Sequence, residues 1–237
     1  MAANREGPVA GIVLAGGSSV RMGADKLWEA LGDRPVIEWS IRAFAGCSSV
    51  DVIVVVSASG SERRMNDLVA VAAPGARVVK GGAERQDSVR AGLDACPEAT
   101  WVVVHDGARP LVTCEMIERG LAAAVPTGAA IAAVPVVDTI KLVEGDVIRG
   151  TPPREALWAA QTPQVFRRLL LLEAHDRATG VVSDDAALVE ALGVAVRVFP
   201  GAYGNIKITT PVDLRIAESL LAASSSGRPT PGDEAKR

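Results

Sequence analysis

The segment from Val9 to Lys26 has the sequence VAGIVLAGGSSVRMGADK. It begins as an apolar run and ends abruptly in the small residues Ala15-Gly16-Gly17-Ser18-Ser19. This pattern predicts a buried β-strand that opens into a loop whose backbone N–H groups can approach a ligand closely. Arg21 and Lys26 follow the loop and offer the fixed positive charge that a polyphosphate requires. A tight strand-to-helix turn with solvated basic residues has the same pattern.

Two common nucleotide motifs are missing from this segment. It has no G-x-x-x-x-G-K-[ST], which excludes a P-loop ATPase of the usual kind. It has no G-x-G-x-x-G after the expected strand, which argues against a dinucleotide site.

The composition is that of an ordinary globular protein. The 237 residues are 49% hydrophobic and 22% charged, with a net charge of -3, which suits one sizeable core and is short for two. The 25 Lys+Arg against 28 Asp+Glu form no basic run, and only 3% of the residues are aromatic. These values argue against general nucleic-acid binding.

The three cysteines and the apolar segments bear on the cellular compartment. Cys47, Cys96 and Cys114 lie far apart and form no C-x-x-C or Cys/His spacing, which favours separate buried thiols in a reducing compartment over disulfides or zinc. No secretory pattern precedes Gly16, and prolines interrupt the longest apolar region, Leu121–Val137. We therefore expect a cytoplasmic protein that does not enter a membrane.

Strand and helix patterns alternate along the first part of the chain. Apolar runs predict strands at Val9–Leu14, Val50–Val56, Arg77–Val79, Trp101–Val104 and Ala130–Val136. Helical patterns separate them at Val36–Phe44, Ser61–Ala72, Arg85–Ala95 and Cys114–Ala124. Continuously apolar strands are covered on both faces, so the fold class is α/β: a three-layer sandwich with a mostly parallel, Rossmann-like sheet. Ligands bind such sheets at the carboxyl ends of the strands.

The pattern changes after Val136. Short runs on both sides of Glu144-Gly145-Asp146 predict a hairpin, and Thr151-Pro152-Pro153 cannot continue a central strand. We expect a protruding β-arm at about 137–156, although a local edge hairpin has the same pattern. Helices near 167–178 and 185–192, a strand at 194–199, a short segment at 205–208 and a helix from Pro211 to about 223 follow. They complete a single domain over residues 1–223, and the polar tail 224–237 is expected to be disordered.

Further polar clusters stand at expected loops. The segment Gly81–Ser88 offers backbone donors to a base or ribose, or forms a simple loop before a helix. Asp106 follows a strand and can hold Mg²⁺ or a sugar hydroxyl, while Arg109 can bind phosphate or pair with Asp106 itself. Arg154 and Lys207 are either anion-binding cations or solvated side chains.

Together these clusters resemble a known family. The motifs LAGGSSVRMGADK, GGAERQDSV, VHDGARP, PVVDTIK, TPQVF, DDAALVE and NIKITTPVDL occur in this order over about the first 220 residues. They resemble the 2-C-methyl-D-erythritol 4-phosphate cytidylyltransferases of non-mevalonate isoprenoid synthesis. The resemblance implies that CMP is transferred from CTP to methylerythritol phosphate with release of pyrophosphate and with Mg²⁺ as cofactor. It also implies a homodimer in which the arm of one copy reaches the active site of the other.

The resemblance assigns roles to single positions. Arg21 and Lys26 match the cations that stabilise the transition state, and Arg154 and Lys207 match those that position methylerythritol phosphate. The positions that match the cytosine and ribose site are Leu14, Ala15, Gly16, Gly82 and Ser88. The positions around the sugar phosphate are Asp106, Arg109, Thr139 and Thr162. Asp106 is also the candidate Mg²⁺ ligand, and the partner chain is expected to contribute Thr139 and Arg154.

Three positions depart from the family pattern, and other activities share parts of it. Ser18 stands where Gly is usual, Asp25 rather than Pro precedes Lys26, and Ala83 replaces a frequent Asp. These departures concern contacts with the triphosphate and the base. A cytidylyltransferase for another polyol phosphate, such as ribitol 5-phosphate, shares most of the motifs. A molybdenum-cofactor nucleotidyltransferase would lack DTIK and NIKIT, and a non-catalytic nucleotide-binding module would not need cations for both reactants.

Overall fold

A seven-stranded sheet forms the centre of the molecule. The computed structural model describes residues 6–16, 26–180 and 182–225. In spatial order the strands are β11 (Arg197–Pro200), β7 (Ala129–Pro135), β10 (Trp158–Arg167), β6 (Trp101–Asp106), β1 (Val9–Ala15), β4 (Val52–Ser57) and β5 (Arg77–Lys80). β10 is antiparallel to both of its neighbours, and the other neighbouring strands are parallel. The predicted mostly parallel sheet is confirmed.

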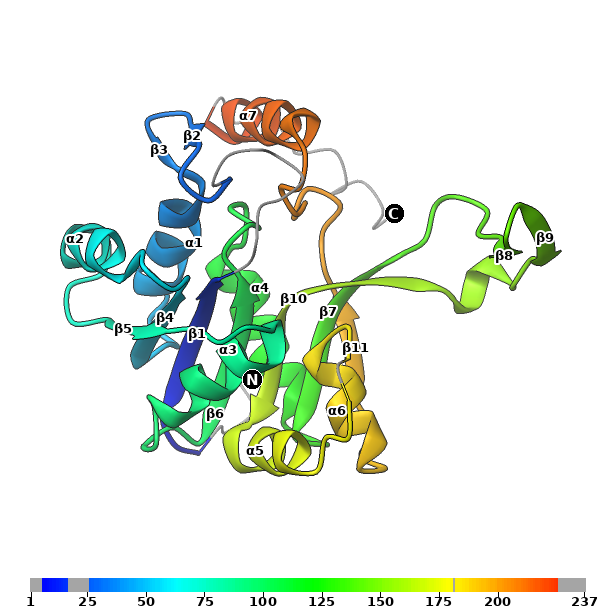
Figure 1. The fold of residues 1–237 in the computed structure, drawn as a ribbon, viewed down its shortest axis with the longest axis horizontal. Helices are drawn as coiled ribbons and strands as arrows, with labels where there is room; N and C mark the ends of the chain where they lie inside the picture. Colours follow the sequence, from blue (N-terminus) through cyan, green and yellow to red (C-terminus); the bar gives the residue numbers. More distant parts are fainter. Residues whose placement is uncertain (1–5, 17–25, 181, 226–237) are drawn as a thin grey trace.

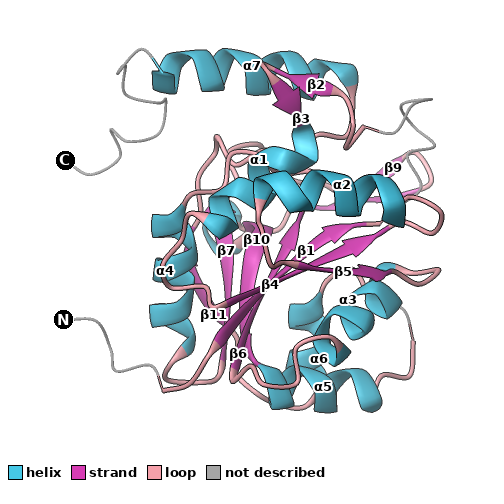
Figure 2. Cartoon of the chain, turned by 90° about the vertical axis from the view of Figure 1, so that its left-hand side faces the viewer, coloured by secondary structure: helices cyan, strands magenta, loops and turns pink. Residues whose placement is uncertain are grey.

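Helices cover both faces of this sheet (Figure 2). One face packs against α1 (Val36–Ala45), α2 (Glu62–Ala72) and α4 (Cys114–Ala124), and the other against α3 (Arg85–Asp94), α5 (Arg168–Asp176) and α6 (Asp185–Ala191). α7 (Pro211–Ser225) lies beyond the end of the sheet, beside β2 (Figure 1). Each layer encloses its own hydrophobic core, which explains why β1 is buried along its whole length. Burial on both faces is the physical reason for its continuous apolar run.

The structure confirms the five strands and four helices expected in the first part of the chain, but it adds β10. This ten-residue strand is absent from the expected set, because Pro163 and the polar residues beside it are unusual in a central strand. The strand accommodates the proline through a register shift between Ala160 and Gln164 and a cis peptide bond between Thr162 and Pro163. A small ribbon of β2 (Ala30–Leu31) and β3 (Arg34–Pro35) is a further addition.

The arm, residues 137–156, projects from one side of the molecule (Figure 1). Its tip is the antiparallel pair β8 (Leu142–Glu144) and β9 (Val147–Gly150), joined through Gly145, whose φ of 64° favours glycine. The apolar side chains of Leu142, Val143, Val147 and Ile148 are exposed there. The structure therefore has the protruding arm rather than a local edge hairpin.

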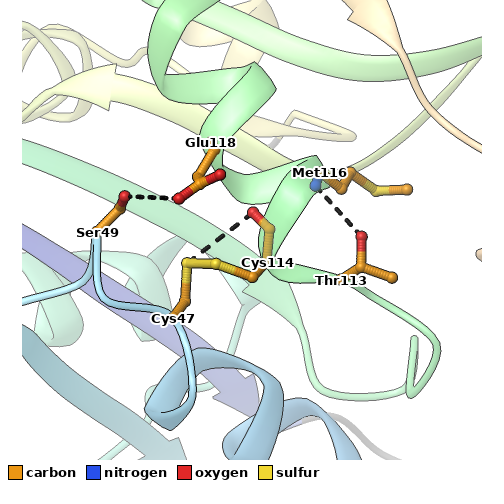
Figure 3. Close-up of a disulfide and its surroundings, with 6 residues drawn as sticks. All are labelled: Cys47, Ser49, Thr113, Cys114, Met116 and Glu118. Carbon is orange, nitrogen blue, oxygen red and sulfur yellow. Dashed lines mark hydrogen bonds between the residues drawn. A yellow bond between two sulfur atoms is a disulfide. The ribbon is translucent and has the colours of Figure 1, made fainter. Parts of the chain in front are cut away.

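A disulfide joins Cys47 and Cys114, which corrects the expectation of three separate thiols (Figure 3). Cys47 lies just after α1 and Cys114 is the first residue of α4, so two neighbouring helices bring together residues separated by 67 positions. Sequence spacing does not reveal such a long-range pair. Cys96 is a buried free thiol, and burial raises its pKa.

The remaining expectations concern the C-terminal region and membranes. α7 begins with Pro211 as expected and extends to Ser225, and the rest of the expected tail lies outside the described residues. The segment 205–208 is a loop rather than a strand. Among the described residues, no helix has both the length and the apolar character needed to span a membrane.

Candidate functional site

The carboxyl ends of β6, β1, β4 and β5 lie side by side at one edge of the sheet. The register pairs Leu14 with Asp106 and Ala15 with Ser57, and Ser57 in turn with Lys80. Loops that are far apart in the sequence therefore leave the sheet at neighbouring points. This carboxyl edge is where ligands bind α/β sheets, and it holds most of the predicted site residues.

Gly16 and the loop before α3 lie near each other at this edge. An ideal Cβ placed on Gly16 would lie 3.5 Å from Ser88 Oγ, so Gly16, the residue that follows β1, lies beside the first turn of α3. Ser88 is buried, and its hydroxyl accepts a hydrogen bond from the Gly82 N–H and donates one to the Glu84 carbonyl oxygen, both at 3.2 Å. Ser88 thus fixes the shape of the loop that precedes α3.

Gly82 is required by the way α3 begins. The Asp87 carboxylate accepts a hydrogen bond from the Glu84 N–H at 3.1 Å, which caps the first turn. A Cβ on Gly82 would lie 2.1 Å from the Asp87 Cβ. A side chain at position 82 would therefore displace the cap, which favours glycine there.

Asp106, the last residue of β6, lies between two cations. Its Oδ2 is 2.7 Å from Lys207 Nζ, and its Oδ1 is 3.5 Å from Arg85 Nε. Burial alone would raise the pKa of Asp106, but the charges of Lys207, Arg85 and Arg109 outweigh it and hold this pKa well below its ordinary value. Asp106 is therefore a permanent carboxylate. The alternative in which Asp106 simply pairs with Arg109 does not describe these contacts.

Lys207 reaches Asp106 because its loop is fastened to the loop after β6. The Ile208 N–H donates to the Ala108 carbonyl oxygen at 2.8 Å, and Arg109 Nη1 donates to the Asn205 carbonyl oxygen at 2.8 Å. Asn205 is buried, and its Nδ2 donates to the Thr162 carbonyl oxygen at 2.8 Å. Lys207 lies between these anchors, with its ammonium held at the carboxyl edge.

Thr162 supports the site from within. Its hydroxyl accepts a hydrogen bond from the Asp106 N–H and lies within bonding distance of His105 Nδ1, both at 3.0 Å. His105 Nε2 lies 3.1 Å from the Arg109 carbonyl oxygen, so this nitrogen carries the proton and Nδ1 accepts from Thr162. Thr162 is buried, and these contacts hold the backbone on both sides of Asp106.

The structure describes only one of the two cations of the first motif. Arg21 lies outside the described residues. Lys26 is half-buried at the start of the segment that leads through β2 and β3 into α1. This segment is fixed by the Ile37 N–H, which donates to the Leu27 carbonyl oxygen at 3.0 Å.

Thr139 and Arg154 stand apart from the other predicted site residues. Both are exposed on the arm, which extends away from the sheet (Figure 1). Arg154 Nη1 donates to the Val137 carbonyl oxygen at 2.9 Å, a contact within the arm. A single chain therefore does not bring these two residues to the carboxyl edge.

Sequence reasoning assigned no role to Arg85 or Asp185. Arg85 Nη1 lies 2.8 Å from Asp185 Oδ2, and the same side chain faces Asp106. Both residues belong to quoted motifs, GGAERQDSV and DDAALVE. The available signal was the position of Arg85 at the start of a helix, where the helix dipole disfavours a cation.

Metal binding at the carboxyl edge would involve Asp106. Each of its oxygens already faces a cation. Among the described residues, the only group of three close metal-ligating side chains is Cys47, Cys114 and Glu118, whose two sulfurs form the disulfide. Mg²⁺ is usually bound through one or two carboxylates together with substrate phosphates and water. The described residues therefore suit Mg²⁺ only in a mode in which phosphate oxygens supply most of the ligands.

Curated relatives cover almost the whole chain. It is 43% identical over 217 residues to the 2-C-methyl-D-erythritol 4-phosphate cytidylyltransferase of Dehalococcoides mccartyi, with 90% of this chain and 96% of that protein covered. It is 46% identical over 221 residues to the enzyme of the same name from Symbiobacterium thermophilum, covering 90% and 93%. It is also 45% identical over 227 residues to a bifunctional IspD/IspF enzyme from an Anaeromyxobacter species, where 92% of this chain spans 58% of the longer protein.

Solved structures agree with these relatives. A 4-diphosphocytidyl-2C-methyl-D-erythritol synthase from Anaerococcus prevotii superimposes with a TM-score of 0.82 at 29% identity, covering 91% of this chain and 99% of that one. The 2-C-methyl-D-erythritol 4-phosphate cytidylyltransferase from Thermus thermophilus gives a TM-score of 0.74 at 36% identity, with coverages of 89% and 98%. The family model described as IspD, 2-C-methyl-D-erythritol 4-phosphate cytidylyltransferase, matches residues 9–223. With its α/β sheet and the residues of its carboxyl edge, the chain belongs to this family of nucleotidyltransferase enzymes.

Proposed function

We propose that this chain transfers CMP from CTP to 2-C-methyl-D-erythritol 4-phosphate, giving 4-diphosphocytidyl-2-C-methyl-D-erythritol and pyrophosphate. The observation that carries the proposal is the Lys207–Asp106 pair at the carboxyl edge, beside the loops of Gly16 and Gly82. The pair offers an oriented ammonium at the carboxyl edge, where we place the nucleotide. Membership of the family supports this choice of substrates.

The reaction needs alignment and charge neutralisation rather than a protein nucleophile. A phosphate oxygen of the polyol attacks the α-phosphorus of CTP, a new P–O bond forms, and the bond between the α-phosphorus and the bridging oxygen breaks to release pyrophosphate. The attacking phosphate is largely dianionic at neutral pH, since its second pKa is about 6. Both reactants are anions, so cations must hold them together in line. We assign this work to Arg21, Lys26, Arg154 and Lys207.

Lys207 is held in a form suited to an anionic partner. Its side chain is 40% exposed, so the ammonium faces both the carboxyl edge and the solvent. Asp106 fixes its direction at 2.7 Å, while Arg109 and Arg85 add positive charge near the same carboxylate. An incoming phosphate therefore meets an ammonium whose position is already set, which lowers the entropy lost on binding.

Mg²⁺ completes the proposal as a cofactor. When bound, Mg²⁺ would supply positive charge that offsets the negative charge developing on the leaving pyrophosphate. Asp106 is the carboxylate at the carboxyl edge that could hold it, in exchange for part of its contact with Lys207 or Arg85.

A homodimer would complete the site. Arg154 and Thr139 lie on an arm whose apolar side chains are exposed, and an isolated two-stranded ribbon is only marginally stable without a surface to pack on. We propose that the arm packs on a second copy and delivers these two residues to the partner's carboxyl edge. We also place the reaction in the cytoplasm, where CTP is available.

A substrate panel tests the function. The protein is incubated with CTP and Mg²⁺ and either methylerythritol phosphate or ribitol 5-phosphate, and pyrophosphate release is followed, with ATP and GTP as donor controls. We expect turnover with CTP and methylerythritol phosphate. Faster turnover with ribitol 5-phosphate would show that the acceptor is another polyol phosphate. Saturable CTP binding without turnover on any acceptor would identify a non-catalytic nucleotide-binding module and reject the proposal.

A further inference from the structure

Arg85 connects two carboxylates that belong to different parts of the fold. Its Nη1 lies 2.8 Å from Asp185 Oδ2, and its Nε lies 3.5 Å from Asp106 Oδ1. Arg85 is the first residue of α3, Asp185 the first of α6 and Asp106 the last of β6. One planar guanidinium therefore links the ends of three separate elements, a geometry that arginine provides and lysine does not.

The contact with Asp185 fixes the guanidinium. Asp185 is 1% exposed, and a carboxylate this deeply buried requires a charged or hydrogen-bonding partner. Its other oxygen, Oδ1, faces His175 Nε2 at 3.5 Å, which is longer than an ordinary hydrogen bond. Arg85 is thus the main partner of Asp185, and this contact with a buried carboxylate anchors the arginine.

The contact with Asp106 then orients that carboxylate. Arg85 faces Oδ1, which leaves Oδ2 directed toward Lys207 at 2.7 Å. Without Arg85 the Asp106 carboxylate would be free to turn about its side-chain bond, and the direction of the Lys207 ammonium would no longer be set. The order of contacts runs from the buried Asp185 through Arg85 and Asp106 to the partly exposed Lys207.

We propose that Arg85, anchored by Asp185, is a positioning residue that sets the Asp106 carboxylate and through it aims the Lys207 ammonium at the phosphate of the acceptor. This inference rests on the proposed function, because it assigns the acceptor phosphate to Lys207. It adds a positioning residue on the acceptor side of the site. Arg85 itself is not assigned a contact with either substrate.

Steady-state kinetics and thermal unfolding of three variants test this assignment. Arg85→Gln removes the charge, and Arg85→Gln with Asp185→Asn also removes the carboxylate that would otherwise be buried without a partner. Arg90→Gln is the matched control, since Arg90 lies on the same helix and forms exposed ion pairs with Asp94 and Asp176. Dimer formation by each variant is checked by sedimentation.

We expect the loss of Arg85 to change the KM for one substrate and not the KM for the other. In Arg85→Gln the KM for methylerythritol phosphate should rise about tenfold, as for the loss of one positioning contact, while the KM for CTP stays within about twofold. The double variant should regain thermal stability but keep the raised acceptor KM. Arg90→Gln should leave both KM values unchanged.

The double variant decides between a positioning and a structural role. If it recovers the wild-type acceptor KM together with its stability, Arg85 merely neutralises Asp185 and the inference is overturned. Equal increases in both KM values would overturn it as well, since they would indicate a general distortion. An inactive wild-type protein in the same assay would instead reject the proposed function, so the two failures are distinguishable.

Discussion

The carboxyl edge of the sheet and the arm hold their polar residues in different ways. At the carboxyl edge, Asp106 is 13% exposed and has a cation at each oxygen, and its backbone N–H is bonded to the buried Thr162. On the arm, Arg154 and Thr139 are exposed, and the surrounding apolar side chains are exposed as well. The carboxyl edge is organised within one chain, whereas the arm has the features of an element that packs on another surface.

This contrast divides the proposed site into two parts. The part at the carboxyl edge, which we assign to the nucleotide and to Lys207, is built by packing within one chain among the residues that the structure describes. The part carried by the arm depends on assembly. The difference predicts that substitutions at the carboxyl edge act on catalysis directly, while substitutions on the arm act through the partner copy.

The largest effect is expected from Lys26→Ala. Loss of a cation that we assign to the transition state should lower kcat about 10²–10³-fold, by analogy with the removal of one oxyanion-stabilising donor. Rapid-quench or steady-state measurement of pyrophosphate release gives the value, and thermal unfolding checks that the fold is retained. Arg63→Ala on the exposed surface of α2 is the control. Near-normal turnover of Lys26→Ala would remove Lys26 from its assigned role.

The next largest effect is expected from loss of the disulfide, which joins two segments beside the central sheet and does not involve the arm. Replacing both Cys47 and Cys114 with Ser should destabilise the protein by about 4 kcal/mol, since the disulfide closes a loop of 67 residues. Denaturant unfolding with and without dithiothreitol measures this difference. The reductant should destabilise the wild type and leave the variant unchanged. A wild type equally stable in both conditions would show that the disulfide contributes nothing to stability.

A smaller effect is expected where α7 begins, beyond the loop of Lys207. Asp213 Oδ2 accepts hydrogen bonds from the Thr209 N–H at 2.9 Å and the Thr210 N–H at 2.7 Å. Partial burial opposes ionisation, but these bonds prevail and lower the pKa of Asp213. Asp213→Asn should therefore cost about 1 kcal/mol, the usual value of a helix cap.

The pH dependence of this contribution has a defined sign. The folded-state pKa of Asp213 lies below its unfolded value, so the stabilisation is fully present above the unfolded pKa of about 4 and is lost as the pH falls through the folded pKa. Urea unfolding at pH 7 and at pH 3 measures it. The difference between wild type and Asp213→Asn should be smaller at pH 3, and a larger difference there would contradict the assignment.

The smallest effect on stability is expected from a substitution on the arm. Ile148 is 60% exposed, so Ile148→Lys should change the free energy of unfolding of a single chain by less than about 0.5 kcal/mol. It should nevertheless convert the dimer into monomers in sedimentation experiments and raise the KM for the acceptor. A fully active, monomeric wild type would remove the arm from the proposed site.

The sequence predicted the parts of the fold that follow from local pattern. The buried run of β1 and the helix at Arg85 each have a local signal, and the structure has both. The loop predicted after Gly16 lies outside the described residues. β10 escaped prediction because its stability comes from pairing with β6 and β7, which outweighs the local preference of Pro163. The disulfide escaped prediction for a similar reason, since the packing of α1 and α4 alone brings its cysteines together.

Prediction of the site was limited in the same way, because contacts between distant segments have no local signal. Motif order identified Asp106 and Lys207 as site residues but not as an ion pair, because their contact depends on the anchoring of the Asn205 loop. The link from Asp106 through Arg85 to Asp185 joins residues 21 and 100 positions apart, as their numbers show. Local patterns name candidate residues, and only the three-dimensional packing assigns their partners.

The most direct test of a site shared between two copies is complementation between two inactive variants. Lys26→Ala removes a cation from the body and Arg154→Ala removes one from the arm, so each homodimer should have two defective sites. After subunit exchange in an equal mixture, half of the dimers are mixed and each contains one intact site, so activity should recover to about a quarter of the wild-type value. Subunit exchange, verified with labelled chains, without any recovery would contradict the account.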